Sequence, residues 1–148
     1  MGTESANVTE PLAARSVTPP AHYLGFEHVL LAMPDGEERR ARAFYVDVLG
    51  FTEVIRPESL GGRGGGWFRA GTVMIHLGVE RDFHAAAMAH PAILVDSLAT
   101  FIARCESLGC PIEPAVKLPG FDRVHVYDPF GNRLEFMQRE AKGSAHLG

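Results

Sequence analysis

The chain has 148 residues, of which 46% are hydrophobic and 22% charged, and its formal net charge is −4. This composition is typical of one globular domain and excludes an intrinsically disordered chain. The acidic balance disfavours nucleic acid as a partner, and no apolar run approaches the roughly 20 residues that span a membrane. Two cysteines, Cys105 and Cys110, cannot form a disulfide framework. We therefore expect a soluble, cytoplasmic protein of one domain.

The two ends of the chain differ from the rest in composition. Residues 1–23 mix Ser, Thr, Pro and Ala without a period, and Pro19-Pro20 disfavours both helix and strand. This stretch has no apolar core of the kind that a signal peptide requires. We predict a flexible tail over residues 1–23, one domain over residues 24–140, and a second tail over residues 141–148.

The first half of the domain is predicted as a strand, a helix and three further strands. The expected strands cover residues 26–33, 51–56, 66–70 and 72–78. The apolar residues with helical spacing are Ala41, Phe44, Tyr45 and Val48. Asp35 and Glu38 resemble a capping box at the start of this helix, and Gly50 is placed to end it.

The second half of the domain repeats the same order of elements. The expected strands cover residues 90–95, 111–117, 121–127 and 132–138. The expected apolar face of the helix consists of Leu98, Phe101, Ile102 and Cys105. Asp96 is the expected N-cap of this helix, and Gly109 is expected to end it.

Regular spacings support an internal duplication. His76 and Glu135 lie 59 residues apart, and His28 and His90 lie 62 residues apart. Such a repeat indicates two copies of one βαβββ unit, covering about residues 24–80 and 88–140. The sequence therefore predicts an α+β fold built from paired modules.

Side-chain alternation separates the two faces of each expected strand. One face is apolar, and the other carries His, Arg, Glu or Tyr between apolar residues. His76 and Glu135 fall on such mixed faces, as do His28, His90 and His125. A mixed face on which histidine recurs is typical of a cavity lining, because a solvent-facing surface has no need for the apolar members.

Several segments together carry a resemblance to a known family. They are Phe26–Val29, Phe44–Phe51, Trp67–Gly71, Ile75–Glu80, His90–Asp96 and Tyr127–Phe136. Their order and spacing resemble the vicinal oxygen chelate superfamily, which includes glyoxalases, bleomycin resistance proteins and extradiol dioxygenases. The resemblance implies a U-shaped, eight-stranded cavity, with one divalent metal ion bound from the first, fourth, fifth and eighth strands.

Carried over by position, the resemblance places metal ligands at three residues of this chain. They are His28 in the first strand, His90 in the fifth and Glu135 in the eighth. Two imidazoles and a carboxylate suit Fe, Mn, Ni, Co or Zn and leave coordination positions open for a substrate. Glu135 is also a candidate catalytic residue.

The fourth-strand position departs from many relatives, which place a glutamate there. This chain has His76, which is expected to act as a fourth ligand or as a general base. The repeat pairs His76 with Glu135, whereas aligning Gly71 with Gly131 pairs Ile75 with Glu135 instead. The lack of a glutamate puts in doubt the proton-shuttling chemistry of true glyoxalase I.

Three classes of function fit these features. The first is a metal-dependent lyase, isomerase, epimerase or thiol transferase acting on a small oxygenated substrate that chelates the ion, with extradiol dioxygenase as a variant. The second is a metal-free, drug-binding protein like the bleomycin resistance proteins, and the third is a ligand-sensing module. The histidine and glutamate set favours the enzyme, because a sequestering protein has no need for it.

Other residues are candidates for contact with a substrate. Arg63, Arg69 and Arg123 are candidates for binding an anionic group, and His125 and Tyr127 for lining the cavity. The open sheet edges of the modules, together with the resemblance, favour a homodimer.

Overall fold

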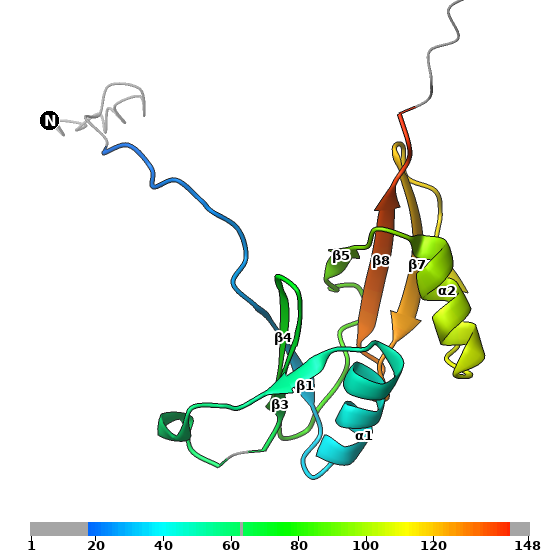
Figure 1. The fold of residues 1–148 in the computed structure, drawn as a ribbon. Coiled ribbons are helices and arrows are strands. Elements are labelled where there is room, and N and C mark those ends of the chain that lie inside the picture. The colour runs from blue at the N-terminus through cyan, green and yellow to red at the C-terminus, as the bar shows by residue number, and fades with distance from the viewer. Residues whose placement is uncertain (1–17, 63, 143–148) are drawn as a thin grey trace, which may run out of the picture.

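The structure is a computed structural model that describes residues 18–62 and 64–142. Its described elements form two βαβββ-like modules in succession along the chain (Figure 1). The expected α+β architecture is confirmed. Most of both expected tails, residues 1–17 and 143–148, lies outside the described residues, as does Arg63.

The N-terminal module is a four-stranded mixed sheet with one longer helical segment, formed by α1 and η2, and one short 3-10 helix. Its elements are β1 (Val29–Met33), α1 (Glu38–Arg42), the π-helix η2 (Ala43–Val48), β2 (Thr52–Val54), the 3-10 helix η3 (Glu58–Leu60), β3 (Gly66–Ala70) and β4 (Val73–Val79). The strand order is β1-β4-β3-β2, with β1 parallel to β4 and the other pairs antiparallel.

The C-terminal module repeats this topology. Its elements are β5 (Ala92–Leu94), α2 (Leu98–Ser107), β6 (Glu113–Pro114), β7 (Phe121–Tyr127) and β8 (Arg133–Arg139). The strand order is β5-β8-β7-β6, again with the first pair parallel and the others antiparallel. The duplication expected from the residue spacing is therefore present in the sheet topology.

Both helix starts differ from the sequence expectation. The N-cap of α2 is Ser97, whose side chain accepts a hydrogen bond from the Thr100 amide, and not Asp96. Among the described residues, no side chain caps the N-terminal helix, so the expected capping box is not formed. Glu38 instead accepts a hydrogen bond from the Gly65 amide, 27 residues away. A carboxylate near a helix start thus serves a tertiary contact that local spacing does not reveal.

Four strands are shorter than expected. β1 covers five residues, where eight were expected, and β2 covers three, where six were expected. β6 covers two residues, where seven were expected, and β5 covers three, where six were expected. β6 pairs only with β7, through Glu113 opposite His125 and Pro114 opposite Val124. Proline donates no ladder hydrogen bond, which limits an edge strand at this point. Because β1 and β5 begin later than expected, His28 lies directly before β1, and His90 lies two residues before β5.

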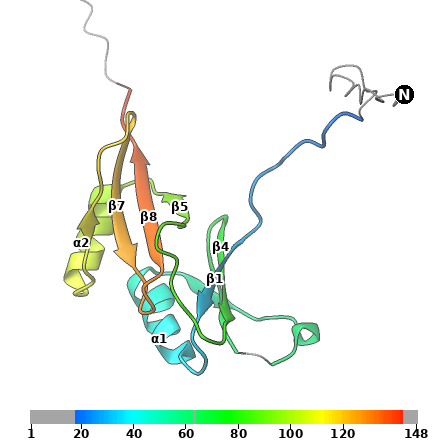
Figure 2. The ribbon, with the colours of Figure 1, turned by 180° about the vertical axis from the view of Figure 1, so that it is seen from behind.

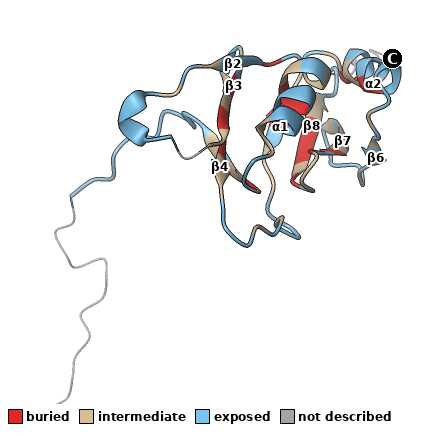
Figure 3. Cartoon of the chain, turned by 90° about the horizontal axis from the view of Figure 1, so that it is seen from below, coloured by how far each residue is buried: buried red, intermediate tan, exposed pale blue. Residues whose placement is uncertain are grey.

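One hydrophobic core joins the two modules. Buried residues lie on both sheets and on the inner sides of the helices (Figure 3). The apolar face expected for the first helix is present, because Ala41, Phe44 and Tyr45 are buried. In the second module, Phe101 of α2 stacks on Phe136 of β8 with ring centroids 4.0 Å apart. This stacking packs α2 against its own sheet.

A buried polar network also connects the modules, at the turn between β7 and β8. The Tyr45 hydroxyl donates to Asp128 Oδ2 at 2.9 Å, and Asn132 Nδ2 donates to the same oxygen at 2.8 Å. Asn132 Nδ2 also donates to the carbonyl of Ala32 in β1 at 2.8 Å. Both views of the ribbon show β1 and this turn close together (Figures 1 and 2). The contact fixes the start of β8 relative to β1.

Among residues 18–62 and 64–142, no helix has the length and apolar character needed to cross a membrane.

Candidate metal centre

Within the described part of the chain, two groups of side chains have their ligand atoms within 4.8 Å of one another. We call Glu27, His28 and His76 the N-terminal cluster, and His90, His125 and Glu135 the C-terminal cluster. Each cluster belongs to one module. The four residues expected to bind one ion are thus brought together in pairs, His28 with His76 and His90 with Glu135.

The sheet register makes the two pairs equivalent. His76 lies opposite Leu30 across β1–β4, and Glu135 lies opposite Ala92 across β5–β8. His28 and His90 each precede that opposing residue by two positions. The alignment that pairs His76 with Glu135 is therefore correct, and the alternative with Ile75 is wrong. Ile75 points to the other face of its strand and is buried in the core.

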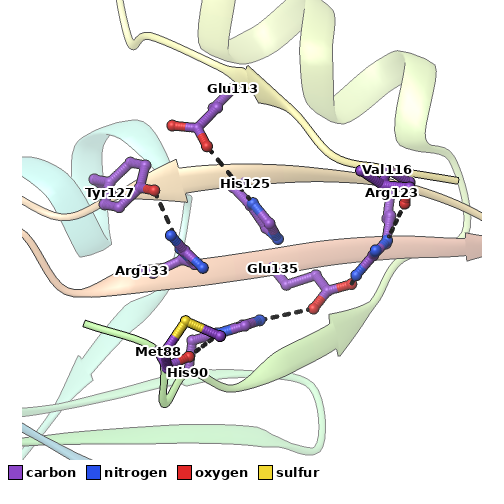
Figure 4. A network of polar contacts seen from close by, with 9 residues as sticks. All are labelled: Met88, His90, Glu113, Val116, Arg123, His125, Tyr127, Arg133 and Glu135. Carbon is purple, nitrogen blue, oxygen red and sulfur yellow. Dashed lines mark hydrogen bonds and ion pairs between the residues drawn. The ribbon is translucent and has the colours of Figure 1, made fainter. Parts of the chain in front are cut away.

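His90 is oriented by a backbone carbonyl. Its Nδ1 lies 2.6 Å from the Met88 carbonyl oxygen, which only accepts, so Nδ1 carries the proton (Figure 4). His90 Nε2 then points at Glu135 Oε2, 2.9 Å away. If the imidazole is neutral, two lone pairs face each other at this distance. The arrangement requires a cation between them, either a proton on Nε2 or a metal ion.

Glu135 is held by a second partner on its other oxygen. Arg123 Nη1 donates to Oε1 at 2.9 Å, and Arg123 Nε donates to the Val116 carbonyl at 2.7 Å (Figure 4). The Glu135 side chain is only 6% exposed. Burial by itself raises its pKa, but the hydrogen bonds from Arg123 and His90 hold the pKa of Glu135 below its usual value. The carboxylate is therefore ionised and has Oε2 directed into the cluster.

His125 lies directly opposite Glu135 across β7–β8. Its side chain is 13% exposed, and its buried Nε2 has no hydrogen-bond partner among residues 18–62 and 64–142. Its Nδ1 faces Glu113 Oε1 at 4.0 Å, which is an ion-pair distance and too long for a hydrogen bond. Burial, followed by the charge of Arg133, lowers the pKa of His125. The ring is thus neutral near pH 7.

The N-terminal cluster is a stack of aromatic rings. The rings of His28 and His76 are 3.9 Å apart, and Trp67 lies on His76 at the same distance with its ring almost parallel. His76 is buried, and its Nε2 has no hydrogen-bond partner. Burial, followed by the nearby His28, lowers the pKa of His76. Glu27 forms an ion pair with His28 Nδ1, which leaves Nε2 of that ring available.

In the described part of the chain, two pockets of nearly equal volume adjoin the clusters. One, of about 700 Å³, is lined by His28, Trp67 and His76 together with Arg56 and Arg69. The other, of about 710 Å³, is lined by residues of both modules, including Leu30, His90 and Arg133. Arg69 therefore lines a pocket beside the N-terminal cluster. Arg123 does not line either pocket and instead binds Glu135.

The donor set fits a divalent transition-metal ion. Neutral imidazole nitrogens and one ionised carboxylate are the ligands that such ions prefer. Two buried ring nitrogens without partners and a carboxylate oxygen aimed at an imidazole nitrogen are features that a bound ion would explain. Sequence reasoning had noted His125 only as a lining residue. Its cross-strand position opposite Glu135 is the signal that relates it to the cluster.

Comparisons with known proteins identify the family. The sequence profile of the Glyoxalase/Bleomycin resistance protein/Dioxygenase superfamily matches residues 25–136. The chain therefore belongs to this superfamily. A putative glyoxalase family protein from Bacillus anthracis is 40% identical in sequence. Its crystal structure superposes with a TM-score of 0.79, and the match covers 82% of this chain and 100% of that one.

More distant structures share the fold. A lactoylglutathione lyase from Agrobacterium tumefaciens is 26% identical, with a TM-score of 0.60 and coverage of 82% of this chain and 96% of that one. The fosfomycin resistance protein FosX from Listeria monocytogenes is 17% identical, with a TM-score of 0.62 and coverage of 80% and 96%. No functionally curated protein matches the chain.

Proposed function

We propose that this protein is a metal-dependent enzyme that acts on a small oxygenated substrate, with His28, His76, His90 and Glu135 as the residues that hold one divalent ion. The observation that carries this proposal is the contact between His90 Nε2 and Glu135 Oε2. The Met88 carbonyl fixes the His90 tautomer, so that this contact needs a cation, either a proton on Nε2 or the proposed metal ion. The His28–His76 pair at the equivalent position of the other module supplies the remaining donors.

The bound ion would act as a Lewis acid that polarises two adjacent oxygens of the substrate. Around the ion, the chain's own residues would orient the substrate and select which substrates bind. Arg69 offers a positive charge beside the N-terminal cluster, and Trp67 supplies a flat apolar wall. His76 is the fourth ligand of the ion or, when its imidazole is not bound to the ion, a general base that accepts a substrate proton. A lyase, isomerase, epimerase or thiol transferase would use such a set.

The metal content of protein purified without added metal tests this proposal. We expect about one divalent ion per chain, and loss of that ion when His28, His90 and Glu135 are all replaced by alanine. An unchanged metal content in the triple variant would refute the site. A protein that neither contains nor binds an ion would be a metal-free binder, for which the stacked rings of Trp67 and His76 offer a surface for a planar ligand.

We also propose that the complete site forms between two copies of the chain. The two clusters are separate in one copy, because no group within 4.8 Å combines described residues of both. Large apolar side chains in β1 and β5, or shortly before these strands, are exposed in the single chain: Phe26, Leu30, Met88 and Leu94. Exposed apolar residues around a polar site are typical of a surface that a partner covers. In a homodimer, His28 and His76 of one copy would face His90 and Glu135 of the other.

Mixing two inactive variants distinguishes a shared site from one within a chain. A His28→Ala/His76→Ala variant and a Glu135→Gln variant each damage every site in their own homodimers. If sites form between copies, a mixed dimer has one intact site, and mixing restores the full metal affinity at half of the sites. If sites form within one chain, mixing restores nothing. A sedimentation mass near 16.1 kDa at micromolar concentration would refute the dimer directly.

A further inference from the structure

His125 is a member of the C-terminal cluster to which the family resemblance assigns no role. It projects from β7 toward the same point as His90 and Glu135, and its ring centroid lies 5.4 Å from that of His90 (Figure 4). Its Nε2 is buried and has no hydrogen-bond partner. A buried ring nitrogen without a partner costs free energy unless something binds it, so its presence here needs an explanation.

The duplicated architecture shows what is particular about this position. His125 lies opposite Glu135, and Trp67 lies opposite His76 at the same place in the other module. The indole of Trp67 fills its position by stacking on His76 at 3.9 Å and offers no ligand atom. At the equivalent place, the C-terminal module has the imidazole of His125, whose unpartnered Nε2 lies in the same cluster as the Glu135 carboxylate. The two modules therefore differ in the number of donors that their sheets provide.

We propose that His125 is a metal ligand, and that His90, His125 and Glu135 form a three-ligand site for one divalent transition-metal ion within a single copy of the chain. This inference rests on the proposed function, since it concerns the ion of the same centre. It adds a ligand from β7 to those of the family pattern. The C-terminal module then holds the ion by itself, and His28 of a second copy adds a further donor when the dimer forms.

The surroundings of the three residues suit this role. The Nδ1 atoms of both rings face oxygens outside the cluster, the Met88 carbonyl for His90 and the Glu113 carboxylate for His125. Because its Nδ1 donates to the Met88 carbonyl, His90 can offer Nε2 to an ion, and the buried Nε2 of His125 has no hydrogen-bond partner among the described residues. Arg123 occupies only Oε1 of Glu135, so Oε2 remains free to bind an ion.

The charges around the cluster also matter for binding a cation. Two guanidinium groups lie nearby. Arg123 is neutralised by its ion pair with Glu135, and Arg133 Nε donates to the Tyr127 hydroxyl at 3.1 Å. Glu113 adds a negative charge on the far side of His125. Two neutral imidazoles and one monodentate carboxylate form a facial set that leaves other coordination positions open.

Titration of the metal-free protein with Co²⁺ tests the proposal, because the ion reports its own ligands. We expect His125→Gln to raise the Co²⁺ dissociation constant by about 100-fold or more, since even residues outside the ligand shell contribute about 10–100-fold. His22→Gln, which removes an exposed histidine, serves as the matched control and should bind as the unsubstituted protein does. His90→Gln is the positive control. Thermal unfolding confirms that each variant is folded.

Proton NMR of the Co²⁺ form provides a second measurement. Each imidazole that binds the ion gives a strongly shifted ring N–H signal, and the spectrum of His125→Gln should contain one fewer such signal than that of the unsubstituted protein. If His125→Gln keeps both the affinity and the number of signals while His90→Gln loses binding, this inference is wrong and the proposed function stands. If the unsubstituted protein does not bind Co²⁺, both are wrong.

Discussion

The polar network at the β7–β8 turn allows a quantitative prediction about stability. The carboxylate of Asp128 accepts four hydrogen bonds, from the Tyr45 hydroxyl, the side-chain and backbone nitrogens of Asn132, and the backbone nitrogen of Phe130. Replacing Asp128 with alanine removes every acceptor at once. Tyr45 is completely buried, so its hydroxyl would be left without a partner and without water.

The size of the effect follows from which donors remain buried. Asn132 Nδ2 keeps the Ala32 carbonyl, and the amide of Phe130 is only partly buried. The Tyr45 hydroxyl and the backbone N–H of Asn132 are the two buried donors left without a partner, and each costs about 1–3 kcal/mol. We expect Asp128→Ala to lower the free energy of unfolding by about 3–5 kcal/mol. For a chain of this size, that lowers Tm by roughly 10 °C.

Chemical and thermal unfolding followed by circular dichroism measure this difference. Tyr45→Phe should cost less, about 1–2 kcal/mol, because the carboxylate keeps three of its donors. Asp35→Ala is the matched control. Asp35 is exposed and caps no helix in the structure, so its loss should change stability by less than about 0.5 kcal/mol. If Asp128→Ala lies within that same margin, the network does not stabilise the junction of the modules and the reasoning fails.

Three further predictions concern the site and the second helix. His76→Gln should lower the turnover of a substrate by the metal-loaded protein by about 100-fold or more. Its Tm should be nearly unchanged, because His76 Nε2 has no hydrogen-bond partner among the described residues to lose. A destabilised variant with intact turnover would show that the role of His76 is structural. Arg123→Met should weaken metal binding by about 10–100-fold in calorimetric titration, because Glu135 loses the donor that orients it, and unchanged affinity would contradict that role. Ser97→Ala should lower the free energy of unfolding by about 1 kcal/mol in denaturant titration through loss of the α2 cap, whereas Asp96→Ala should have little effect.

Local chemistry accounts for the features that the sequence determined by itself. β3 and β7 occupy the expected residues. The alternation of their side chains and the glycines near their ends determine where these strands begin and end. The apolar spacing of the helices predicted their buried faces, and the 59-residue offset predicted the equivalence of His76 and Glu135 that the sheet register shows. Each of these features can be recognised from a short stretch of sequence or from a repeated spacing between residues.

The tertiary structure decided the features that depend on distant partners. Sequence spacing did not reveal that Arg123 binds Glu135, or that Glu38 binds the amide of Gly65, because such contacts join residues on separate strands and loops. It also did not reveal that the expected ligands form two separate clusters, one in each module. Periodicity determines which face of a strand a side chain occupies, whereas the packing of one sheet relative to another determines which faces meet.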